Sequence, residues 1–271
     1  YTIYVLAYDE NGLPTGLKSL TCSTGAVADD PFTVTTTHVG TTTLKYNVTA
    51  KDASVKYCTF ATGYDYYQRW QLEEGTNGDV IKHFISMWST FASWYGENWQ
   101  TMMKYDRREG TYEGDGYHLM WDARQVVITF GMDDDGNLVT PIQVDSIHTN
   151  APTPVDMDIP VTVLSNEWGD QQIKAAPTTN TPYFITMQPA AYVDLYKTDA
   201  ALLRALCYEA DNINPTDLAR TRDEDLRDGL WEFRVRKDVD TDYYIIAVGL
   251  DEGAPATRAF KTKITVPGGS F

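Results

Sequence analysis

The segment Gln125–Gly136 reads QVVITFGMDDDG, and the segment Tyr243–Gly253 reads YYIIAVGLDEG. Each is a run of β-branched and aromatic residues, followed by Gly, an apolar residue, Asp at the same offset and a closing Gly. The segment Tyr1–Gly12, YTIYVLAYDENG, has the same pattern with Ala at the position of the first Gly. An apolar run that ends in a Gly turn predicts a strand entering a β-hairpin. The sequence therefore contains three copies of one hairpin.

The spacing of these hairpins divides the chain. Ala7 and Gly131 are 124 residues apart, and Gly131 and Gly249 are 118 apart. Pro-containing linkers follow the first two hairpins, at 25–31 and 150–154. We therefore expect three parts: the closing hairpin of a preceding unit at 1–25, a complete unit at 26–150 and a second complete unit at 151–271. A lone hairpin is only marginally stable, so residues 1–25 are expected to pack on a neighbour, on another chain or on upstream residues.

Each complete unit opens with strand patterns and has helical patterns in its middle. The expected strands are 32–37, 43–49 and 55–61 in the first unit and 158–164, 172–176 and 182–187 in the second. In residues 79–95 the apolar side chains that share one helical face are Ile81, Phe84, Ile85, Trp88, Ala92 and Tyr95. A second helix is expected after Thr198 or Asp199, with Leu202, Leu203, Leu206 and Ala210 on one side. The fold class is thus mainly β, with a helical insertion between the third strand and the closing strands of each unit.

The hairpin resembles the last hairpin of the fibronectin type III superfamily, in which Tyr, apolar residues and Ala alternate. The residues that carry the resemblance are Thr241-x-Tyr243-x-Ile245-x-Ala247-x-Gly249 and Tyr1-x-Ile3-x-Val5-x-Ala7. The resemblance implies tandem fibronectin type III/Ig-like β-sandwiches. In the middle copy Gln125 stands where the family has Tyr, so the resemblance does not imply a tyrosine corner in that unit.

Units of about 120 residues with helical insertions are similar to modules of Bacteroidetes-type cell-surface lipoproteins. That resemblance implies an exported protein at the cell surface, an outer-membrane lipoprotein whose anchor lies outside these residues. It also implies an adhesive or binding character. It carries over no catalytic residue, because the family motif contains none.

Charge and hydropathy exclude two classes of partner. The chain has 22 Lys and Arg against 38 Asp and Glu, a net charge of −16. Such a charge repels phosphate backbones and anionic lipids, so we expect no nucleic-acid partner and no binding to membrane surfaces. The longest apolar stretches have eight residues, far fewer than the roughly 20 needed to cross a bilayer. No membrane span is expected.

Residues that could carry chemistry do not form a recognised motif. Cys22, Cys58 and Cys207 are widely spaced, which favours buried thiols over a disulfide or zinc site. The four histidines lie 30 to 45 residues apart. The acidic run 133–137 places Gly at its fourth position and so departs from a calcium loop; a hairpin turn is the favoured interpretation. We therefore predict no metal, no cofactor and no catalytic residue.

An aromatic block is the strongest functional signal. Residues 64–99 hold ten of the 34 aromatic residues. Trp94 lies about 140° around the helix from Ile81, Trp70 is placed in an acidic loop and Trp99 follows the helix end. Flat exposed rings suit stacking on sugars or contact with a protein. The candidate ligand-binding residues are Trp70, Trp94, Trp99, Tyr66 and Tyr67. The alternative, and the favoured interpretation of the block, is a second small core between the helix and the connection at 110–117.

Two functions remain open. The first is a non-catalytic extracellular module for adhesion, ligand binding or spacing, with a glycan or a host or cell-surface protein as partner. The alternative is a carbohydrate-active hydrolase or accessory domain that uses carboxylates of the helical insertion, such as Glu73-Glu74 or Asp223-Glu224-Asp225. Active-site residues should depart from the shared plan in one unit, and only aromatic residues are concentrated in that way. The module is the favoured interpretation.

Overall fold

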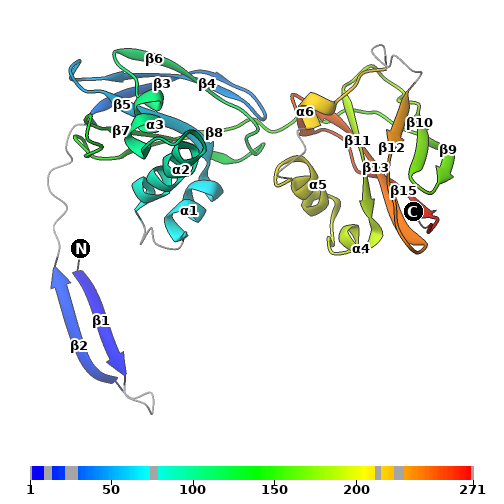
Figure 1. Ribbon diagram of the computed structural model, residues 1–271, viewed down its shortest axis with the longest axis horizontal. Coiled ribbons are helices and arrows are strands. Elements are labelled where there is room, and N and C mark those ends of the chain that lie inside the picture. The colour runs from blue at the N-terminus through cyan, green and yellow to red at the C-terminus, as the bar shows by residue number, and fades with distance from the viewer. Residues whose placement is uncertain are drawn as a thin grey trace.

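The computed structural model describes residues 2–8, 14–21, 30–73, 79–210, 215–222 and 229–269. Within them the chain forms two β-sandwiches, each covered on one side by helices (Figure 1). The first sandwich contains residues 32–148, and the second contains residues 161–266. The expected fold class, mainly β with tandem sandwiches and helical insertions, is confirmed.

The first sandwich pairs its strands in two antiparallel sheets. One sheet has the order β3-β4-β6 and the other has the order β5-β7-β8. Their bounds are β3 (Phe32–Val39), β4 (Leu44–Ala50), β5 (Tyr57–Gly63), β6 (Thr111–Gly116), β7 (Arg124–Gly131) and β8 (Gln143–His148). Three helices, α1 (Tyr64–Leu72), α2 (Val80–Tyr95) and α3 (Trp99–Asp106), stand between β5 and β6. They cover the outer face of the β5-β7-β8 sheet (Figure 1).

The second sandwich repeats this plan. One sheet has the order β12-β10-β9, and in the other β13 pairs with β11, β14 and β15. The strands are β9 (Val161–Glu167), β10 (Asp170–Ala175), β11 (Tyr183–Pro189), β12 (Leu230–Phe233), β13 (Thr241–Asp251), β14 (Ala254–Pro255) and β15 (Phe260–Val266). The helices α4 (Ala190–Val193), α5 (Asp199–Cys207) and α6 (Pro215–Leu218) again follow the third strand.

The hairpin of residues 1–25 is described as two paired strands. They are β1 (Thr2–Tyr8) and β2 (Pro14–Thr21), which run antiparallel with Ile3 opposite Leu20. The pairs β7–β8 and β13–β15 are antiparallel in the same way, so all three hairpins expected from the repeat are present.

In β7 and β13 the repeated strand is mostly apolar because it is buried on both faces. In β7, Val127 faces the core between the two sheets, whereas Val126, Ile128 and Phe130 face the helices. β13 divides in the same way, with alternate residues in the sheet–sheet core and in the helix-facing core. A strand covered on both sides loses the polar alternation of a half-exposed strand. The sequence signal that marks the repeat is therefore a consequence of the helical insertion.

In each sandwich the first Gly of the repeat, Gly131 or Gly249, is required because a threonine packs against it from across the hairpin. Thr140 Oγ1 accepts a hydrogen bond from Gly131 N at 2.8 Å, and Thr257 Oγ1 accepts one from Gly249 N at 2.9 Å. A Cβ on either glycine would stand 2.8 Å from the Cγ2 of that threonine. Close approach of the threonine leaves no room for a side chain, and the same contact recurs in both sandwiches.

The structure corrects three expectations. Residues 111–116, interpreted as a connection, form strand β6, and residues 230–233 form a further strand, β12. Tyr112 therefore packs in the sheet–sheet core and not against the helices. The expected second core does exist, but the helices build it against the β5-β7-β8 sheet. Tyr95, expected on the buried face of α2, is exposed because the helix ends there, at Gly96 with φ 70°.

Candidate functional site

Helix α2 carries five of the ten residues of the aromatic block and is fixed at both ends. Asp79 caps its first turn by accepting a hydrogen bond from Ile81 N at 3.0 Å, and Gly96 ends it in the left-handed conformation. The buried face consists of Val80, Ile81, Phe84, Trp88 and Ala92. Because this face lies on the sheet, the last turn presents its other aromatic residues to solvent.

Three aromatic side chains at the end of α2 form an exposed face. Trp94 is 68% exposed, Tyr95 73% and Phe91 40%. The rings of Phe91 and Trp94 meet edge to face, with centroids 5.2 Å apart. Residues three and four apart are neighbours on a helix surface, so the spacing of Phe91, Trp94 and Tyr95 brings the three together. We call these three residues the aromatic face.

The other two candidate tryptophans are packed inside the insertion, and Trp70, expected in an acidic loop, lies in helix α1. Trp70 stacks on the ring of His83 with centroids 4.3 Å apart and meets Phe84 edge to face. Trp99 stacks on Trp88 at 6.2 Å and covers Gly136 in the turn between β7 and β8. Both rings are half-buried. The structure therefore does not bring Trp70, Trp94 and Trp99 together, because each has a different neighbour.

The two candidate tyrosines differ in surroundings. Tyr67 packs on Tyr64 with centroids 6.2 Å apart, and burial raises the pKa of its hydroxyl. Tyr66 meets Tyr208 of the second sandwich edge to face at 5.6 Å, and the Arg69 guanidinium lies over its ring at 4.9 Å. Tyr66 thus belongs to the contact between the two sandwiches.

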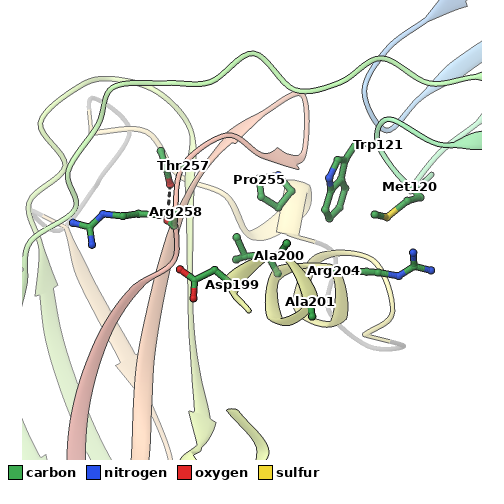
Figure 2. A pocket seen from close by; sticks show the side chains of 10 residues that line it. Met120, Trp121, Asp199, Ala200, Ala201, Arg204, Pro255, Thr257 and Arg258 are labelled. Carbon is green, nitrogen blue, oxygen red and sulfur yellow. Dashed lines mark hydrogen bonds between the residues drawn. The ribbon is translucent and has the colours of Figure 1, made fainter. Parts of the chain in front are cut away.

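A cleft of about 560 Å³ opens between the sandwiches. Figure 2 shows Trp121, from the connection between β6 and β7, facing Pro255 and the start of α5. The polar groups at its edge already have partners: Asp199 accepts from Lys261 Nζ at 2.7 Å, and the hydroxyl of Thr257 donates to Arg258 O at 2.9 Å. The sequence analysis did not find this cleft, because its walls come from segments about 80 and 130 residues apart.

The acidic turn 133–137 uses its carboxylates within the fold. Asp133 accepts hydrogen bonds from Asp135 N, Asn137 N and Asn137 Nδ2 at 2.8–3.0 Å, and the bonds from Asn137 hold its pKa below the usual range. Asp134 forms an ion pair with Arg107. Among the described residues, no group of three His, Cys, Asp or Glu side chains is arranged to hold a metal ion.

The acidic pairs weighed for a hydrolase are only partly described. Glu73 contacts His83, with its Oε2 atom 2.8 Å from Nδ1. Glu74 and the run 223–225 lie outside the described residues. His118 and His148 have other partners, Cys207 O and the Asp122 carboxylate.

Strand order identifies the type of sandwich. In each unit the first, second and fourth strands form one sheet, and the third, fifth and last form the other. This is the division of fibronectin type III and Ig-like sandwiches, with the helices in place of the strand that follows the third one. The fold is fibronectin type III-like. Within the described residues, no helix is both long and apolar enough to cross a bilayer.

Comparisons with known proteins add little to this fibronectin type III-like assignment. No protein-family model and no curated protein matches the chain. Similar solved structures include the FN1–FN3 domains of chicken CNTN1, at 10% identity and a TM-score of 0.27, covering 87% of this chain and 65% of that one. Another is a two-domain fibronectin type III segment of chicken tenascin, at 8% identity and a TM-score of 0.27, covering 88% of this chain and 99% of that one. The chain thus spans just under two thirds of the CNTN1 segment. Scores this low carry no argument, so the assignment rests on strand order and register.

Proposed function

We propose that the chain is a non-catalytic extracellular module that binds a glycan or a cell-surface protein through the aromatic face of α2. The observation that supports this best is the exposure of Trp94, 68% for a side chain that most proteins bury to a large extent. Tyr95 and Phe91 extend the apolar area on the same turn. An exposed cluster of this kind is typical of interaction sites.

The proposal extends to the organisation and location of the protein. Residues 26–150 and 151–271 are two fibronectin type III-like modules, and residues 1–25 are the closing hairpin of a preceding module. The protein is exported and held at the cell surface as an outer-membrane lipoprotein, through an anchor outside these residues. The excess of negative charge, −16, fits a partner that is neutral or basic.

The test replaces Trp94 by Ala and measures binding to immobilised polysaccharides, mucin glycans and extracellular proteins. Because Trp94 makes its ring contact with Phe91 at the surface, the variant should keep its fold, as checked by circular dichroism. Loss of a central aromatic contact should weaken binding at least tenfold, or about 1.4 kcal/mol.

Tyr117→Ala is the matched control, because Tyr117 is 65% exposed but follows β6 on the opposite sheet. It should bind as the parent protein does. Trp99 is unsuitable as a binding variant since its ring packs on Trp88. Equal binding by Trp94→Ala and the parent would reject the aromatic face as the binding surface.

A further inference from the structure

The two sandwiches meet through side chains on both sides of the connecting segment. On one side, the turn between β3 and β4 lies against the turn that follows β13. Thr41 N donates to Glu252 Oε2 at 3.2 Å, and the Thr42 hydroxyl donates to Glu252 O at 2.6 Å. Thr41 and Thr42 are both buried. The Glu252 carboxylate of the second sandwich thus binds a backbone N–H in a turn of the first sandwich.

A second contact joins the helical insertions. Asp65, in the first turn of α1, accepts a hydrogen bond from the Tyr208 hydroxyl at 2.8 Å and from Arg204 Nη2 at 2.9 Å. The Tyr208 side chain is buried there, next to the ring of Tyr66. Gly63 makes this approach possible, since a Cβ at that position would stand 2.4 Å from the Tyr208 hydroxyl oxygen.

The segment between the sandwiches is bonded to both turns. Asn150 donates from its backbone to Gly40 O at 3.0 Å and from its side chain to Val39 O at 2.8 Å. Three residues later, Thr153 N donates to the carboxylate of Asp251 at 2.6 Å. The connection is therefore anchored at each end and is not a loose linker.

Of the residues that make these contacts, Asp65, Thr41 and Thr42 stand at positions where the two sandwiches differ, whereas Asp251 and Glu252 match Asp133 and Asp134 of the first sandwich. Gly63 pairs with Gln125 and Pro189 pairs with Tyr243, so the repeat places Ala191 where the first sandwich has Asp65. The turn between β9 and β10 has Trp168 and Gly169 in place of the two threonines. The acid at Asp65 and the hydroxyls at Thr41 and Thr42 are therefore not part of the plan that the two sandwiches share.

We propose that these contacts, which we call the junction, hold the two sandwiches as one rigid body with a fixed angle between them. The junction consists of Thr41 and Thr42 with Glu252, and of Asp65 with Arg204 and Tyr208. Tandem domains usually move against each other unless their interface is extensive. Here two contacts on different elements oppose bending and twisting together, and the apolar cleft at Trp121 is held open between them. The inference is independent of the proposed function.

The test is ¹⁵N relaxation of the whole chain, with small-angle X-ray scattering as a second measurement. In the parent protein, amides of both sandwiches should report one shared rotational correlation time. The variant Asp65→Ala/Glu252→Ala removes an acceptor from each contact. Its rotational correlation time should fall by about a third, because each sandwich then tumbles partly by itself. The distribution of interatomic distances from X-ray scattering should broaden, because the angle between the sandwiches then varies.

The matched control is Asp134→Ala/Asp242→Ala. It removes the same charge and two ion pairs that lie within single sandwiches, those with Arg107 and Lys263. It should tumble as the parent does. Gly63→Ala is a second junction variant that adds only a methyl group against Tyr208, and it should loosen the pair even if the double variant fails to fold. Separate tumbling in the parent, or parent-like tumbling in both junction variants, would overturn the proposal.

Discussion

At the scale of single residues, the two described cysteines are expected to be inert. Cys58 and Cys207 are buried, and burial raises the pKa of each thiol to about 12. The thiolate is the reactive form, so at pH 8 only about one thiol in 10⁴ is ionised. In a Cys22→Ser background the native protein should not react with Ellman's reagent at pH 8, and two thiols should react in guanidinium. Because a raised pKa favours the neutral form, native reactivity should grow only as the pH approaches 12. Rapid reaction of either thiol at pH 8 would contradict the burial.

Gln125 shows what a single residue can and cannot predict. A glutamine at this position predicts that the first sandwich has no tyrosine corner, but it does not predict what replaces one. In the structure the amide of Gln125 donates to Met120 O at 2.8 Å, and the Thr149 hydroxyl donates to the same oxygen at 2.6 Å. A glutamine and a threonine thus donate the hydrogen bonds to an upstream carbonyl that a tyrosine hydroxyl donates in a tyrosine corner. Thr149 lies 24 residues away from Gln125 in the chain. Such pairing depends on the folded strand order, which local sequence does not contain.

At the scale of elements, the turn between β7 and β8 is held by Trp99 of α3. Gly136 has φ 89°, and a Cβ there would stand 2.2 Å from the Trp99 ring. Gly136→Ala should therefore destabilise the protein by more than the roughly 1 kcal/mol of left-handed strain alone. Gly110→Ala is the control, because Gly110 has φ 67° and open space around its Cβ position. Urea unfolding should show the larger loss for Gly136→Ala. Equal losses of stability in the two variants would mean that the Trp99 ring does not restrict the residue at position 136.

The elements that sequence patterns missed include the two fourth strands. β6 reads TYEGDG, and its Gly, Asp and Glu residues are depleted in strands, so it was interpreted as a connection. Its Gly114 is required because the Tyr46 ring of β4 lies 2.4 Å from where a Cβ would be. The hairpins and α2 were predictable, since their periodicity is local. The strand that completes each first sheet is set by a neighbour more than 50 residues away. The burial of Trp70 and Trp99, which leaves Trp94 as the exposed ring, depends on rings of a different helix, α2.

At the scale of the whole molecule, the cores indicate how the chain can be divided. The described apolar clusters fall into two pairs, one pair in each sandwich, and Trp121 crosses from the first sandwich to pack against the helix-facing core of the second. Each sandwich therefore has hydrophobic cores of its own, as an independent domain does. The proposed division predicts that residues 26–150 and residues 151–271, expressed separately, each unfold in one cooperative transition.

Residues 151–271, expressed alone, should lose more stability from this separation than residues 26–150. Without Trp121, part of the surface of α5 becomes exposed, which should cost about 1–3 kcal/mol for a large aromatic side chain. The whole chain with Trp121→Ala should show a loss of similar size in its second sandwich, which separates the effect of the missing ring from that of the cut. Circular dichroism and Trp fluorescence during urea unfolding measure both. A piece that lacks a cooperative transition would place the boundary elsewhere than at residue 150, because a sandwich with complete sheets and both of its cores should fold alone.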